Sequence, residues 1–104
     1  MANIMTSDGS PGKDEQQCLV YPNPIFTACI FEVPVDGNGN ARIEIYDAMG
    51  TLRSLMQKEY RESGTMQFTW DARDASGTRL PAGYYMYRII SGEQIFTGKI
   101  LINR

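Results

Sequence analysis

The stretch Ala41-Arg42-Ile43-Glu44-Ile45-Tyr46-Asp47-Ala48-Met49-Gly50 alternates small or apolar residues with polar ones over its first six positions. Side chains two residues apart point to the same face of a pleated strand. The pattern therefore predicts a half-buried strand whose inner residues are Ala41, Ile43 and Ile45 and whose outer, water-facing residues are Arg42, Glu44 and Tyr46. Gly50 suits a turn with positive φ directly after that strand.

The same alternation recurs before and after this stretch. It places one group of side chains inside, namely Cys29, Phe31 and Val33, and Met66, Phe68 and Trp70; it places Ile30, Glu32, Thr65, Gln67 and Thr69 outside. Residues 52–59 also fit a helical spacing, but Gly50 and Gly64 leave room for only a very short helix, so we predict a strand. Two long strands, residues 83–91 and 94–102, close the chain, and residues 19–21 form the first.

Seven short strands separated by glycine-bearing turns are typical of an all-β fold. We therefore predict a seven-stranded antiparallel β-sandwich of the immunoglobulin or fibronectin type III kind. Leu80-Pro81-Ala82-Gly83 leads into Tyr85, an arrangement similar to a tyrosine corner, in which a phenol hydroxyl anchors the chain where it enters a late strand. Trp70 is then the large core residue between the sheets.

A chain of 104 residues fits one domain with a modest core. We expect a flexible linker or an added tag over residues 1–17, which are polar and aperiodic, and the sandwich over residues 18–104. The first residues lack the order of a signal peptide, which does not by itself place the protein in the cytoplasm. The net charge of −2 and the interspersed charges provide no basic stripe, so nucleic acid and membrane surfaces are not expected partners.

The sequence contains no histidine, which removes the usual general base and the commonest metal ligand. A carboxylate pair remains, and Asp71 with Asp74 is the best candidate. Glycosidase chemistry needs two carboxyls facing each other across a sugar, whereas these two lie in one tight connection and are better suited to capping a turn. We therefore expect no enzyme activity, no cofactor, no metal and no small-molecule substrate.

Two cysteines, Cys18 and Cys29, could form one disulfide if strand pairing brings them together, and otherwise remain separate thiols. Residues 36–40, Asp-Gly-Asn-Gly-Asn, look like the start of a calcium loop but depart from that pattern at Ala41, and Asn-Gly predicts a hairpin turn. Exposed tyrosines can stack on sugar rings, which leaves a carbohydrate-binding alternative on Tyr46, Tyr60 and Tyr84.

Six short motifs are spread along the chain from residue 21 to residue 102. They are Tyr21-Pro22-Asn23-Pro24, the strand ending in Val33-Pro34, Tyr46-Asp47 with Gly50, Trp70-Asp71 with Asp74 and Gly77, Gly83 with Tyr85, and the terminal Lys99-Ile100-Leu101-Ile102. In this order they resemble the type A C-terminal sorting domains of type IX secretion cargo and the closely similar immunoglobulin-like domain of flagellar hook-capping proteins. The resemblance covers Tyr21 to Arg104.

The resemblance implies a sorting module, which an outer-membrane secretion machinery reads as an address. The implied partners are that machinery and a covalently linked N-terminal cargo domain. The implied location is the cell surface or the medium, reached through the periplasm of a Gram-negative bacterium. The Trp70-Asp71 loop leans toward the hook-capping branch, so the alternative is a structural or carbohydrate-binding accessory module of an extracellular enzyme or a hook-cap-like assembly.

Overall fold

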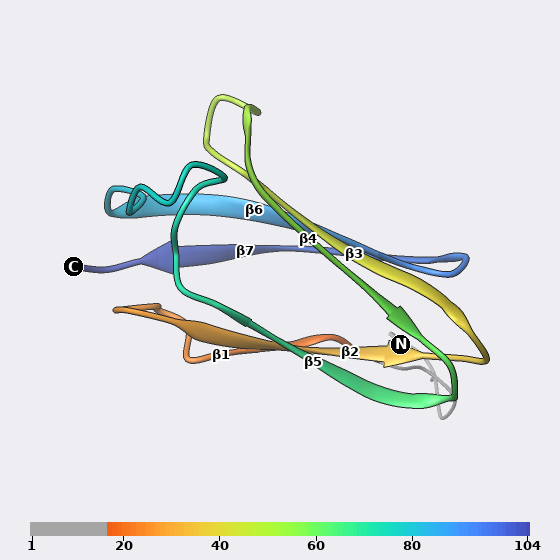
Figure 1. Cartoon of the computed structure of the whole chain (residues 1–104). Coiled ribbons are helices and arrows are strands. Elements are labelled where there is room, and N and C mark those ends of the chain that lie inside the picture. The colour runs from red at the N-terminus through yellow and green to blue at the C-terminus, as the bar shows by residue number, and fades with distance from the viewer. Residues whose placement is uncertain (1–16) are drawn as a thin grey trace, which may run out of the picture.

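The computed structural model describes residues 17–104, which form two antiparallel sheets packed face to face (Figure 1). One sheet has the order β1-β2-β5 and the other β4-β3-β6-β7. The strands are β1 (Leu19–Tyr21), β2 (Cys29–Val35), β3 (Gly39–Tyr46), β4 (Leu52–Tyr60), β5 (Gly64–Trp70), β6 (Gly83–Ser91) and β7 (Gln94–Ile102). The predicted seven-stranded sandwich is confirmed, including the strand over residues 52–59. The predicted linker lies outside the described residues except for Gln17.

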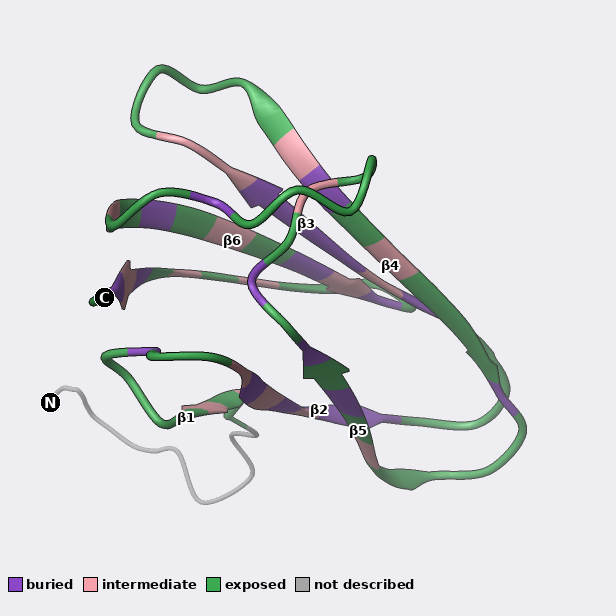
Figure 2. Ribbon diagram, turned by 60° about the vertical axis from the view of Figure 1, so that its left-hand side comes forward, coloured by how far each residue is buried: buried purple, intermediate pink, exposed green. Residues whose placement is uncertain are grey.

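The core lies between the two sheets, and buried residues alternate with exposed ones along the strands (Figure 2). Phe31, Phe68 and Trp70 from the smaller sheet meet Ile43, Ile45 and Ile89 from the larger one. Their alternation along the strands is the one that the sequence predicts. In the part of the chain that the structure describes, no helix is long and apolar enough to cross a membrane.

An aromatic pair joins the two sheets. The ring of Tyr87 on β6 packs edge-on against Phe31 on β2, with ring centroids 5.6 Å apart and planes at 79°. Gly98 on β7 pairs with Tyr87 in the register, and a Cβ at Gly98 would overlap the Tyr87 ring. Glycine at this position therefore makes room for the ring that links the layers.

The prediction of a hairpin at residues 36–40 is wrong. Asn-Gly signals a chain reversal, but β2 and β3 lie in different sheets, so this connection crosses from one layer to the other. The suggested disulfide is not formed, since Cys18 and Cys29 are both free. Leu19 pairs with Glu32, three residues along β2 from Cys29, and at about 3.3 Å per residue the thiols lie too far apart to bridge.

Two predicted exposures also differ from the structure. Glu44, expected in water, is only 6% exposed, because side chains from β3 itself and from β6 close over it. Tyr60, expected outside the core, is 7% exposed and covers Gly39. Both lie at the end of the sandwich opposite the C-terminus. Both differences arise from neighbours that local alternation does not reveal.

Candidate functional site

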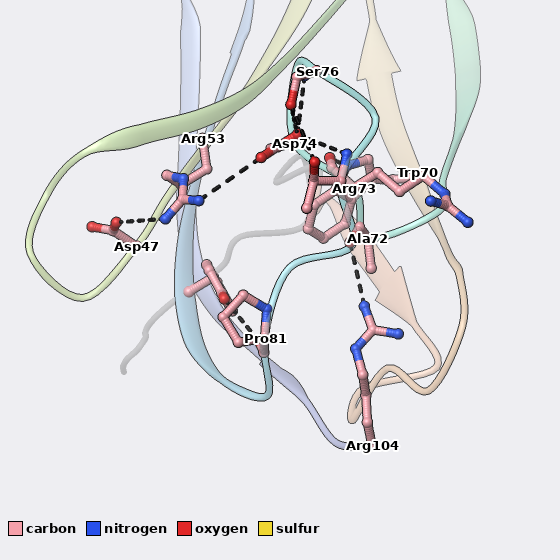
Figure 3. A network of polar contacts seen from close by, with 11 residues as sticks. Asp47, Arg53, Trp70, Ala72, Arg73, Asp74, Ser76, Pro81 and Arg104 are labelled. Atoms are coloured by element: carbon pink, nitrogen blue, oxygen red, sulfur yellow. Dashed lines mark hydrogen bonds and ion pairs between the residues drawn. The ribbon is translucent and has the colours of Figure 1, made fainter.

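Most of the predicted motif residues gather at one end of the sandwich. We call this region the turn end, and it comprises residues 22–25, 47–53, 70–85 and Arg104. Figure 3 shows its polar contacts, which connect the turn after β3, the start of β4 and the long connection between β5 and β6. The structure thus brings together motifs that are scattered along the sequence.

The turn after β3 is organised by Asp47. Its Oδ1 accepts hydrogen bonds from the backbone N–H groups of Met49 and Thr51, at 2.9 and 3.0 Å. Its own N–H donates to the Thr51 carbonyl at 3.0 Å. Gly50 has φ +83°, a left-handed conformation that a residue with a Cβ rarely adopts. The predicted role of Gly50 in a turn with positive φ is confirmed.

A second turn repeats this arrangement in the connection between β5 and β6. Asp74 Oδ1 accepts from the N–H groups of Ser76 and Thr78, at 3.0 and 2.9 Å, and from the Ser76 hydroxyl at 2.8 Å. Gly77 has φ +89°. Both turns read Asp-Ala-x-Gly-Thr, at residues 47–51 and 74–78. None of the predicted motifs includes this repeat, although the five-residue match is visible in the sequence.

Arg53 at the start of β4 lies between the two turns. Its guanidinium contacts Asp47 Oδ2 at 3.2 Å and Asp74 Oδ2 at 3.9 Å, and its backbone carbonyl accepts from the Ala75 N–H at 3.1 Å. The Thr51 N–H chiefly lowers the pKa of Asp47, with Arg53 contributing. The Ser76 hydroxyl chiefly lowers the pKa of Asp74. Both aspartates are therefore held ionised as acceptors within the fold.

Trp70 ends β5 and packs in the core, with its indole N–H donating to the Arg73 carbonyl at 3.2 Å. Ala72 follows with φ +60° and is completely buried. Its carbonyl accepts from the Leu80 N–H at 2.9 Å and from the Arg104 guanidinium at 3.3 Å. The end of the chain is thus tied to the loop that follows the tryptophan.

Asp71 differs from Asp74 in its surroundings. Its side chain is 63% exposed and forms an ion pair with Arg73 at 3.4 Å. Each aspartate therefore has its own partners, and none of the polar contacts of the described residues joins the two carboxylates. The geometry supports turn capping by Asp74 rather than a pair of reacting acids.

The tyrosine corner is present as predicted. Tyr85 is buried, and its hydroxyl donates to the Pro81 carbonyl four residues earlier at 2.7 Å. Gly83, at the start of β6, has φ +146° and lets the backbone bend between them. This contact sets the angle at which β6 enters the larger sheet.

The Tyr21-Pro22-Asn23-Pro24 segment docks on the edge of β7, and both of its Xaa-Pro bonds are cis. The Asn23 amide accepts from the Leu101 N–H at 3.1 Å and donates to the Lys99 carbonyl at 3.3 Å. It thereby makes the two bonds that a peptide group of a neighbouring strand would make. Ile25 continues the pairing, with its N–H 2.7 Å from the Leu101 carbonyl.

This docking closes one side of the sandwich. The Tyr21 hydroxyl donates to Glu32 on the outer surface of the smaller sheet. Ile25 forms a parallel bridge to Ile102 and is completely buried. On the opposite side Lys58 of β4 donates to the Gln67 carbonyl of β5 at 2.8 Å. Each side therefore has contacts that connect the two sheets.

The family profile described as the FlgD Ig-like domain matches residues 32–93, which is more than half of the chain. The chain belongs to this family. Immunoglobulin-like β-sandwich domains of the FlgD Ig-like family are typically non-catalytic. The matched region runs from β2 to the turn before β7 and contains both Asp-Ala-x-Gly-Thr turns and the tyrosine corner.

Solved structures share the fold of this FlgD Ig-like domain. Dimeric latent PorU from Porphyromonas gingivalis matches with a TM-score of 0.69 and 22% identity over 82% of this chain. FlgD from Xanthomonas campestris, a hook-capping protein of flagellar assembly, matches with a TM-score of 0.61 and 24% identity over 81% of this chain. PorZ from Porphyromonas gingivalis, an essential bacterial surface component of the type IX secretion system, matches with a TM-score of 0.58 and 23% identity over 84% of this chain.

The matched region is a small part of the two secretion proteins. It covers 9% of the PorU chain, 11% of PorZ and 60% of FlgD. At these identities the likeness establishes a common fold. No curated protein matches the sequence at a significant level.

Proposed function

We propose that this domain is a non-catalytic sorting module that directs a covalently linked cargo through an outer-membrane export system to the surface of a Gram-negative bacterium. The observation that carries this proposal is the likeness to PorU and PorZ, in each of which the same sandwich is about a tenth of a much longer chain. PorZ is described as a surface component of the type IX secretion system. A small module shared by such proteins suits the role of an address.

The construction of the turn end supports the same role. Three of its charged groups, Asp47, Arg53 and Asp74, are paired with one another and with backbone groups. These interactions stabilise a fixed shape without placing reactive groups around a substrate. A receptor can therefore recognise the folded surface of the domain.

The test is a fusion of the full chain to the C-terminus of a periplasmic reporter in a bacterium with a working type IX system. We expect the reporter on the cell surface, and in the periplasm of an otherwise identical strain that lacks the secretion system. Retention in the periplasm of the working strain would contradict the proposed function. Circular dichroism of the purified fusion confirms that the domain is folded.

A structural role in a hook-cap-like assembly is the second candidate. It is favoured by the family match and by the larger share of FlgD that the chain covers. Binding of the purified chain to isolated flagellar hooks, with no surface display of the reporter, would favour this role. For the carbohydrate-binding alternative, Tyr60 is buried and cannot stack on a sugar ring, whereas Tyr84 is 61% exposed.

A further inference from the structure

The outer face of the larger sheet combines charges and exposed apolar side chains. Opposed residues in a register share one face of the sheet. The register sets Glu44 between Leu55 and Arg88, and it sets Met86 beside Lys99. Ile95 lies on the same face of β7, four residues before Lys99. We call this surface the outer face, defined by Glu44, Leu55, Met86, Arg88, Ile95 and Lys99.

Its centre carries an excess of positive charge. Glu44 accepts from Arg42 Nε at 3.0 Å and from the Tyr46 hydroxyl at 2.8 Å, and lies 3.8 Å from Arg88 Nε. The Arg42 and Arg88 side chains remain 42% and 48% exposed. One carboxylate thus faces two guanidinium groups, and Lys99 adds a third positive group on a chain whose net charge is −2. The exposed guanidinium edges can donate hydrogen bonds to an acidic group of a partner.

Apolar side chains surround this centre. Leu55, Met86 and Ile95 are 44%, 49% and 59% exposed. A hollow of about 280 Å³ opens beside Met86 and Arg88, with Tyr46, Asp47 and Gly50 on its wall. Methionine, tyrosine and arginine are enriched in protein interfaces relative to other surfaces. The hollow has room for one large apolar side chain next to the arginine.

We infer that the outer face docks a partner protein which presents a large apolar side chain beside an acidic one. The apolar side chain fills the hollow, and the carboxylate contacts Arg88. A second copy of this chain fits poorly, because two such faces, each with more positive than negative groups at its centre, would repel one another. The inference rests on the proposed function, with the partner being the component of the export machinery that reads the domain.

The outer surface of the smaller sheet provides a contrast and a control. It carries Thr65, Gln67 and Thr69 from β5, and Gln67 and Tyr21 both hydrogen-bond to Glu32 there. These residues form a polar surface with an acidic centre. A charge placed at Thr69 therefore tests whether any change in surface charge affects docking.

The experiment measures surface display of the full-chain reporter fusion for Met86→Asp, Arg88→Glu and the control Thr69→Glu. We expect about a tenfold loss of display for the first two variants, as for central interface residues, and unchanged display for the control. Thermal melting of each purified chain establishes whether it is folded. If Arg88→Glu does not fold, Met86→Asp decides, because Met86 makes no ion pair.

The outcomes separate the inference from the function. Display of both outer-face variants at the level of the unaltered chain would overturn the inference, as would an equal loss for Thr69→Glu. A dimer of the purified chain that Met86→Asp converts to a monomer would also overturn it, because the occupant would then be a second copy. Failure of the unaltered fusion to reach the surface would instead overturn the proposed function.

Discussion

The turn end and the outer face use similar residues in opposite ways. At the turn end Arg53 lies between two carboxylates, and the oxygens of both aspartates are occupied by backbone and hydroxyl donors. On the outer face two half-exposed arginines share one carboxylate, Glu44, among exposed apolar side chains. Polar groups that are fully paired stabilise a shape, whereas partly paired ones remain available to a partner.

Most of the family-motif residues therefore lie apart from the surface that we propose is recognised, and the motif Tyr46-Asp47 with Gly50 is the one that also lines its hollow. Asp47, Asp74 and Tyr85 all act inward, on their own turns or on the corner before β6. Substitutions there should lower stability, whereas substitution of the exposed, unpaired Met86 on the outer face should leave the fold intact.

The largest effect is expected for Trp70→Ala. The side chain is 3% exposed in the core, so its removal leaves a cavity that should cost about 3–5 kcal/mol of unfolding free energy. That is a large fraction of the stability of a small domain. Urea denaturation measures the loss, and Trp70→Phe, which keeps most of the volume, should lose much less. Equal stability of the alanine variant would show that the turn end does not depend on this residue.

Gly98→Ala tests the core beneath the outer face. The new Cβ would overlap the Tyr87 ring, which must shift from its place against Phe31, at an expected cost of about 1–3 kcal/mol. In a Tyr87→Leu background the ring is gone, so Gly98→Ala should lower the unfolding free energy by less than it does in the unaltered chain. A double-mutant cycle measures this difference. An unchanged cost in the double variant would contradict the clash.

Tyr85→Phe removes the hydroxyl that donates to the Pro81 carbonyl and leaves the ring in place. We expect a loss of about 1 kcal/mol, the usual contribution of one hydrogen bond. In a domain of this size that corresponds to a fall of about 4–8 °C in Tm. The matched control is Tyr84→Phe, whose ring is exposed on the neighbouring position. Equal shifts in the two variants would mean that the corner contributes nothing specific.

The smallest expected effect is the pH dependence of the two aspartate turns. The folded-state pKa values of Asp47 and Asp74 are lowered, so their contribution is complete above the unfolded pKa, near 4, and disappears as the pH falls through the folded values. Asp74→Asn should therefore lower Tm at pH 7, and the difference in Tm between this variant and the unaltered chain should narrow below about pH 4. Asp71→Asn, at an exposed site, is the control. A difference in Tm between Asp74→Asn and the unaltered chain that is the same at pH 7 and pH 3 would contradict this prediction.

Much of the sandwich could be predicted because strand alternation is a local property. Residues 65–70 reveal their buried face without reference to any other strand, and the same holds for residues 41–46. The tyrosine corner was also predictable, since Pro81 and Tyr85 are four residues apart. The family resemblance could be drawn from the order of the motifs.

What could not be predicted depends on contacts between distant segments. Glu44 is buried by Arg88, which only the pairing of β3 with β6 brings beside it. The segment after Val35 signals a reversal, but a local signal does not specify which sheet receives the next strand. The junction at Arg53 requires both aspartate turns to be in place, although their shared Asp-Ala-x-Gly-Thr sequence was readable.

The most direct test of the account compares two variants of the full-chain reporter fusion in both stability and surface display. We predict that Asp74→Asn lowers Tm but is displayed like the unaltered chain at 25 °C, where it remains folded. We predict that Met86→Asp keeps its Tm and loses about tenfold in display. The opposite result, in which Asp74→Asn abolishes display without lowering Tm and Met86→Asp is displayed normally, would show that the motif itself is recognised and would contradict the account.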